Sequence, residues 1–168
     1  MNLFRGFKRE LWTTDWRICL LWGMIACLAC GAVLWLAGGA SVYRQICGEC
    51  VVPIPALWLF LRQGTALILG LSLGLILGRQ CNCSERGRKR GIGWWLSGYI
   101  AMLSWLLIFL SGWGEVLSLL LLAWSILSFI LAIEWFARES LLSACLLVIG
   151  ILWMMGSFGL TIRIILWN

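Results

Sequence analysis

The sequence predicts an all-α membrane protein, a single domain built as a bundle of five transmembrane helices. Of its 168 residues, 62% are apolar and 12% are charged, and the mean hydropathy is +0.98. Soluble domains are typically about 45–50% apolar and about 25% charged. The composition therefore excludes a water-soluble domain. It also excludes a disordered chain, because disordered chains combine low hydrophobicity with high net charge.

Five stretches of the chain are long enough to cross a membrane as helices, which takes about 20 mainly apolar residues. Glycines or charged residues separate these stretches. None alternates apolar and polar residues over about ten positions, as the strands of a membrane barrel do. The predicted spans are residues 18–36, 56–77, 93–111, 116–136 and 141–166.

The basic residues predict the orientation of the bundle. Ten of the thirteen Lys and Arg residues precede the first span, lie between the second and third, or lie between the fourth and fifth. Basic residues near span ends favour the cytoplasmic side, so the N-terminus is expected inside and the C-terminus outside. The net charge of +6 is then explained by topology and by contact with lipid headgroups. We therefore expect membrane lipid and no nucleic acid as a partner, with the run Arg86–Arg90 in a loop.

Catalytic and metal chemistry have few candidate residues. The chain has no His and seven acidic residues, and no nucleophile–base pair is visible, so no catalytic residue is assigned. Eight Cys include the pairs Cys47/Cys50 and Cys81/Cys83, but a whole span separates these pairs and one tetrahedral zinc site cannot use both. No metal site is therefore predicted. Cys47 and Cys50 belong to the outer loop, where a disulfide is chemically allowed, and the bridge is left open.

Tryptophans are unusually frequent, with thirteen in the chain. In membrane proteins Trp is most often an anchor at the lipid–water interface. Trp105 and Trp153 lie near the middle of their spans, where this explanation fails, so they either pack between helices or line a ligand site. Anchors are expected at the Trp residues near span ends: Trp12, Trp16, Trp35, Trp94, Trp95, Trp113, Trp135 and Trp167.

Several eroded motifs follow one another along most of the chain. The second span opens with Pro53-Ile-Pro55-Ala-Leu-Trp58-Leu-Phe60. This resembles the P-P-x-W-x-F-x-x-x-W-T-x-L-Y signature of the TspO/MBR family, the translocator proteins, also called peripheral-type benzodiazepine receptors or tryptophan-rich sensory proteins. Further positions similar to the family are Tyr43, Thr65, Leu67, Trp105, Phe109, Leu152, Trp153, Leu160 and Asn168.

The chain also departs from the family pattern. Gly64 stands where the family has a second Trp, and Ile68, Met102 and Thr161 replace its Tyr and two Asn residues. The tyrosine of the C-terminal cholesterol pattern is missing as well. Light-dependent porphyrin degradation, reported for some members, is therefore in doubt, and we do not assign an enzymatic activity.

The resemblance implies a cavity between helices for flat hydrophobic molecules, especially tetrapyrroles such as protoporphyrin and haem, as ligands rather than bound cofactors. Transport, sensing or disposal of the ligand would be the function, in a bacterial cytoplasmic membrane. The expected ligand-binding residues are Trp58, Phe60, Trp105, Phe109, Trp153 and Ser157, with Arg62 and Arg163 facing ligand carboxylates.

Three alternatives remain open from the residues. Arg62 and Arg163 are also placed for snorkelling of their long side chains to the interface. The chain as a whole is also compatible with a structural or regulatory membrane subunit without a ligand, or with a small solute transporter. A homodimer is left open.

Glu134 and Arg138, spaced i,i+4, are expected to form a local ion pair.

The charge count makes a testable prediction about topology. Reporter fusions at Arg88 and at Asn168 are expected to report opposite compartments, with Arg88 in the cytoplasm. The same compartment for both positions would contradict a chain that crosses the membrane five times.

Overall fold

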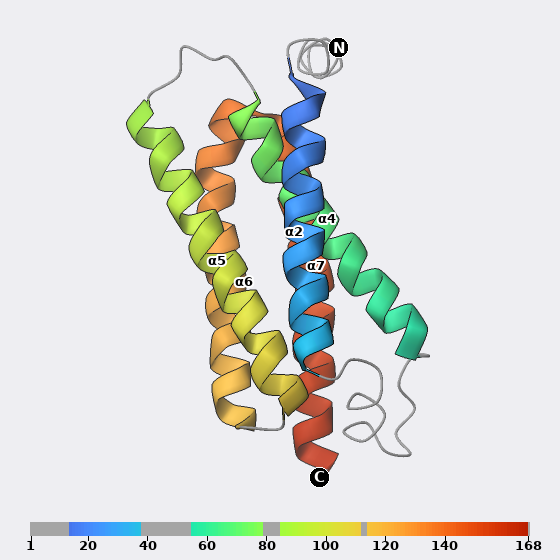
Figure 1. Ribbon diagram of the computed structural model, residues 1–168. Helices are drawn as coiled ribbons and strands as arrows, with labels where there is room; N and C mark the ends of the chain where they lie inside the picture. Colours follow the sequence, from blue (N-terminus) through green and yellow to red (C-terminus); the bar gives the residue numbers. More distant parts are fainter. Residues whose placement is uncertain (1–13, 38–54, 79–84, 112–113, 168) are drawn as a thin grey trace, which may run out of the picture.

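The computed structural model in Figure 1 describes residues 14–37, 55–78, 85–111 and 114–167. Each helix in this part of the chain contains a segment long and apolar enough to cross a membrane. The prediction of an all-α membrane bundle of five helices is therefore confirmed. The helices are α2 (Trp16–Leu36), α4 (Pro55–Leu77), α5 (Glu85–Ser111), α6 (Glu115–Glu139) and α7 (Leu141–Trp167).

Local signals in the sequence fix several helix starts. The Asp15 carboxylate accepts a hydrogen bond from the Arg17 backbone N–H at 3.0 Å and caps α2. The Ser140 hydroxyl accepts from the Ser143 N–H at 3.2 Å and caps α7 in the same way. Gly114, directly before α6, has a φ of 124°, a conformation in which a side chain would be strained.

The start of α5 differs from the prediction. The basic run Arg86–Arg90 was expected in a loop, but it forms the first turns of a helix that begins at Glu85. Two local interactions explain the extension. The acidic Glu85 lies in the first turn, where it complements the helix dipole. Its carboxylate also forms an i,i+4 ion pair with Lys89 at 2.7 Å.

The helices form a closed ring in which chain neighbours run in opposite directions (Figure 1). Helix α2 packs on α4, α4 on α7, α7 on α6, α6 on α5, and α5 returns to α2. Helices α2, α5 and α7 begin at one end, which carries the arginines of α5 and is called the basic end below. At that end the Asp15 N–H donates to the Gly78 carbonyl at 3.2 Å, which ties the start of α2 to the end of α4.

Two side-chain predictions can be compared with this arrangement. Glu134 and Arg138 form the expected ion pair, with 2.8 Å between the carboxylate and the guanidinium. Trp95 was expected to be an interface anchor, and this prediction is wrong. Its ring is buried and stacks on Tyr99, with the ring centroids 5.0 Å apart. Trp35, in contrast, is 82% exposed at the end of α2, as an anchor requires.

Close backbone contact between α2 and α4 depends on two glycines of α4. A Cβ atom at Gly70 would lie 2.5 Å from the Trp22 carbonyl oxygen, and one at Gly74 would lie 2.5 Å from the Cα of Cys19. Both obstacles are backbone atoms, which cannot move aside as a flexible side chain can. Small residues at such positions let helices pack closely in membranes, where the hydrophobic effect does not drive helices together.

This packing predicts the effect of adding one methyl group. Gly70→Ala or Gly74→Ala is expected to destabilise the bundle by about 1–3 kcal/mol, because α2 and α4 must separate. Gly156→Ala in α7 is the matched control, since a Cβ there meets no atom within 4 Å. Thermal unfolding in detergent measures the difference. An equal change in all three variants would contradict the close contact.

Candidate functional site

Arg62 is the most unusual residue of the bundle interior. It lies seven positions after the first residue of α4, about 10 Å along the helix at about 1.5 Å per residue. Its side chain does not extend to the end of the bundle, as snorkelling would require, because the residue is only 1% exposed. The Nε, Nη1 and Nη2 atoms are all buried, and they have no hydrogen-bond partner among the described residues.

The guanidinium lies over the indole ring of Trp105 in α5, 4.2 Å from the ring centroid. Trp105 itself is 1% exposed and stacks on Phe109, with centroids 5.6 Å apart and ring planes 21° apart. A cation over an indole is attracted by the ring quadrupole, by about 2 kcal/mol or more when both are desolvated. We call Arg62, Trp105 and Phe109 the Arg62 cluster.

No described carboxylate neutralises this cation. Cys30 of α2 and Tyr99 of α5 are the titratable side chains that interact electrostatically with Arg62. Both are neutral at pH 7 in their ordinary state, with reference pKa values of about 8.5 and 10. The described acidic side chains, Asp15, Glu85, Glu134 and Glu139, belong to the basic end, which is about 20 Å from Arg62 along α4 at about 1.5 Å per residue.

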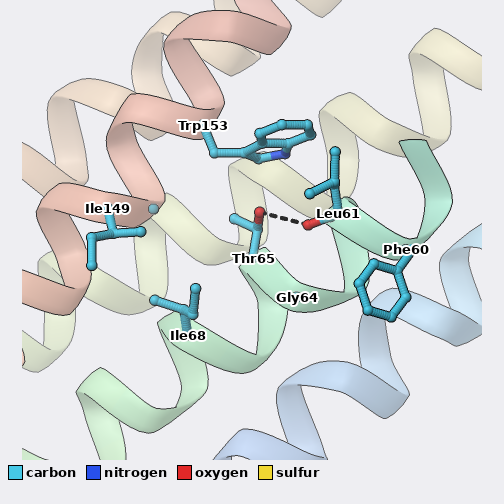
Figure 2. Close-up of a pocket in the computed structure, with 8 residues that line it drawn as sticks. Phe60, Leu61, Gly64, Thr65, Ile68, Ile149 and Trp153 are labelled. Atoms are coloured by element: carbon cyan, nitrogen blue, oxygen red, sulfur yellow. Dashed lines mark hydrogen bonds between the residues drawn. The ribbon is translucent and has the colours of Figure 1, made fainter. Parts of the chain in front are cut away.

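A groove opens between α4 and α7, on a different face of α4 from Arg62. Its volume is about 190 Å³. Figure 2 shows the indole of Trp153 lying over Leu61 and Thr65, while Phe60 lies at the rim and is 74% exposed. The complete lining is Phe60, Leu61, Gly64, Thr65, Ile68, Ile149, Gly150 and Trp153.

The groove is hollow because one of its residues, Gly64, is a glycine, and it is apolar because the Thr65 hydroxyl bonds to the backbone of its own helix. A Cβ at Gly64 would meet no atom within 4 Å, so this glycine leaves space that a larger residue would fill. The Thr65 hydroxyl donates to the Leu61 carbonyl at 2.9 Å (Figure 2). Thr65 therefore contributes its methyl group to the groove rather than a free hydroxyl. The indole Nε1–H of Trp153 is buried and has no acceptor among the described residues. The groove is thus apolar, with one unused donor.

The structure divides the expected ligand-binding residues between these two places. Trp105, Phe109 and Arg62 meet in the interior, whereas Phe60 and Trp153 line the groove. The described residues do not join the two sets in one pocket. Their connection is α4 itself, because Leu61 lines the groove and the next residue, Arg62, points into the ring of helices.

The remaining expected residues have other surroundings. Ser157 is buried and its hydroxyl donates to the Trp153 carbonyl at 3.2 Å, so it binds its own helix. Arg163 is exposed. The Trp58 side chain and the pair Cys47 and Cys50 lie outside the described residues, so the ligand role of Trp58 and the disulfide remain predictions.

Sequence reasoning missed most of the groove lining, although a signal was present. Positions 61, 64, 65 and 68 recur at the spacing of one helix face, and so do positions 149, 150 and 153. Combining this spacing with the unusual Gly64 indicates a hollow face on α4. The contact of Trp105 with Arg62 has no such signal, because it joins two helices that are distant in the sequence.

Comparison with known proteins does not place the chain in a family. No family model matches the sequence, and no curated protein matches it.

Proposed function

We propose that this integral membrane protein binds a hydrophobic molecule that carries a carboxylate, with tetrapyrroles such as protoporphyrin and haem as the ligand class, for transport, sensing or disposal. The observation that carries the proposal is the buried guanidinium of Arg62, which has no anionic or hydrogen-bonding partner in the described part of the chain. We further propose a bacterial cytoplasmic membrane, with the basic end in the cytoplasm.

A buried charge without a partner is energetically costly. An ion that leaves water without a counterion loses several kcal/mol even after the protein relaxes. The Trp105 ring returns only part of this energy, about 2 kcal/mol or more. A carboxylate fits the remaining need, because the guanidinium fork binds its two oxygens in parallel hydrogen bonds. A ligand with such a group would be held most strongly at Arg62.

The aromatic rings favour a planar partner. Offset stacking adds about 0.5–1.5 kcal/mol for each aromatic pair beyond the burial of area. Trp153 in the groove and Trp105 in the interior flank the same stretch of α4. Each also has a buried Nε1–H without an acceptor among the described residues, which would become a donor to ligand oxygens once the surrounding side chains move.

Size places part of a tetrapyrrole outside the groove. At about 190 Å³ the groove is smaller than the roughly 300–1,000 Å³ of typical small-molecule sites. The ring would therefore rest partly on the exposed rim formed by Phe60 and Ile149, or separate α4 from α7. Since the groove lining does not include Arg62, a ligand carboxylate would reach the guanidinium only after α4 shifts.

The first test of the proposal compares protoporphyrin with its dimethyl ester. Arg62→Gln is expected to weaken binding of the free acid by about 10- to 100-fold, the value of one charge-assisted hydrogen bond, and to change ester binding little. Arg17→Gln, an exposed arginine at the basic end, is the control. Quenching of tryptophan fluorescence measures the affinities on variants that retain the elution volume and helical circular dichroism of the wild type.

Two outcomes of this experiment would contradict the proposal. If wild-type protein binds neither porphyrin, the alternative of a membrane subunit without a ligand is favoured. If Arg62→Gln and Arg17→Gln bind the free acid equally well, the carboxylate does not reach Arg62.

A second test addresses the aromatic wall. Trp153→Ala is expected to lower the affinity for protoporphyrin by about 5- to 150-fold, since it removes roughly 1–3 kcal/mol of stacking and burial. Trp35→Ala removes an indole that is 82% exposed and is expected to leave the affinity unchanged. Equal losses in the two variants would mean that the porphyrin is dissolved in detergent or lipid.

A further inference from the structure

One face of α5 combines a cluster of positive charges with an apolar groove. Arg86, Lys89 and Arg90, together with the acidic Glu85, surround a hollow at the basic end, where the light-green start of α5 lies in Figure 1. A second hollow, of about 520 Å³, is lined by Leu121 and Trp124 of α6 and, on α5, by residues from Gly93 to Ser104. These positions follow each other at intervals of three and four residues, the spacing of a single helix face. Charge and groove are therefore continuous.

The charged part has an excess of cations. Lys89 is paired with Glu85, and Arg138 of α6 is paired with Glu134. The guanidinium of Arg90 lies 5.7 Å from the centroid of the Trp135 ring, and that of Arg138 lies 5.1 Å from the same ring on α6. Arg86 and Arg90 have no carboxylate partner among the described residues. The surface thus offers two guanidiniums without a carboxylate partner, Arg86 and Arg90, and such groups suit a phosphate group.

The groove part is open and apolar. A Cβ at Gly93 would meet no atom within 4 Å, and Leu96 and Ile100 are about half exposed. Two of its polar groups bind each other, since the Trp124 indole N–H donates to the Ser97 hydroxyl at 3.1 Å, and Ser104 adds one hydroxyl at the far end of the groove. What the groove offers to a neighbour is therefore hydrocarbon contact.

The dimensions match one leaflet of a membrane. From Gly93 to Ser104 the helix rises about 16 Å, at about 1.5 Å per residue. Half of a hydrocarbon core is about 15 Å thick. An acyl chain that enters beside Gly93 would follow the groove to the middle of the bilayer. Its headgroup would lie one to two helical turns away, at Arg90 and Arg86.

We propose that this face of α5 and α6 is a binding site for one anionic phospholipid. Its phosphate lies between Arg86 and Arg90, and one acyl chain fills the groove from Gly93 to Ser104. Charge complementarity selects an anionic headgroup, and the continuous groove selects a lipid over a free phosphate. The site is separate from the Arg62 cluster and does not depend on the proposed function.

Phosphatidylglycerol is the probe, and native mass spectrometry of the full-length protein in detergent measures how many lipids stay bound. One phosphatidylglycerol is expected to bind more tightly than phosphatidylcholine. Each of Arg86→Gln and Arg90→Gln is expected to weaken this binding about 5-fold, from the roughly 1 kcal/mol that one basic residue contributes near an anionic surface. Arg17→Gln is the charge control.

Gly93→Leu tests the groove, because the new side chain fills the space of the acyl chain. It is expected to weaken phosphatidylglycerol binding without changing the charge. Gly156→Leu in α7 is the control, since that glycine also has no atom near its Cβ position. Glycerol 3-phosphate, which has the head but no chains, is expected not to compete.

Three outcomes would overturn the proposal. Competition by glycerol 3-phosphate would make the site a phosphate site. Equal binding by Gly93→Leu and wild type would leave only a headgroup attraction. Loss of a protein dimer in Gly93→Leu, with phosphatidylglycerol binding unchanged, would mean that a second copy occupies the groove.

Discussion

A helix bundle in hydrocarbon has no water to bind its buried polar groups, and this constraint organises the interior. Most hydroxyls of the described core satisfy it with backbone carbonyls as acceptors, whereas the buried Ser128 hydroxyl has no partner among the described residues. Ser125 donates to Gly98 at 2.7 Å, and Ser143 donates to Ser72 at 2.7 Å, so each bond joins two helices. Tyr99 ties α5 to α2 through the Ala26 carbonyl at 2.6 Å. Arg62 is the charged exception, because its three nitrogen atoms have no such acceptor among the described residues; the indole N–H groups of Trp95, Trp105 and Trp153 lack one as well.

Arg62 differs from the other buried polar groups because it is charged, and burying an unpaired charge costs more free energy than burying a neutral group. Ion pairs and hydrogen bonds are the usual means of keeping a charge inside a membrane protein. Here an aromatic face replaces them, with the guanidinium 4.2 Å from the Trp105 ring. The close contact of α2 with α4 through Gly70 and Gly74 holds α4 in place, and Arg62 is the side chain through which α4 reaches Trp105 of α5.

The sequence predicts the helices well because the membrane imposes a length and an apolar composition on each span. It also identifies Arg62, since a charge inside a predicted span is unusual. It does not predict that Trp105 lies beneath Arg62 while Trp153 lies in a separate groove, because helix rotation depends on packing between distant segments. The helical start of α5 was missed for a different reason. A run of charged residues such as 86–90 is typical of a loop, and Glu85 and Lys89 come together as an ion pair only when the segment is helical.

Arg62 has no counterion among the described residues, and the stability of Arg62→Met in ligand-free detergent tests this claim most directly. Replacing an unpaired buried charge by an apolar residue of similar length removes its desolvation cost. Thermal unfolding is therefore expected to show a gain of about 1–4 kcal/mol, the range seen when buried ionic groups are replaced by apolar ones. A loss of about 3–5 kcal/mol would contradict the claim, because it is the cost of leaving a paired carboxylate alone in the interior.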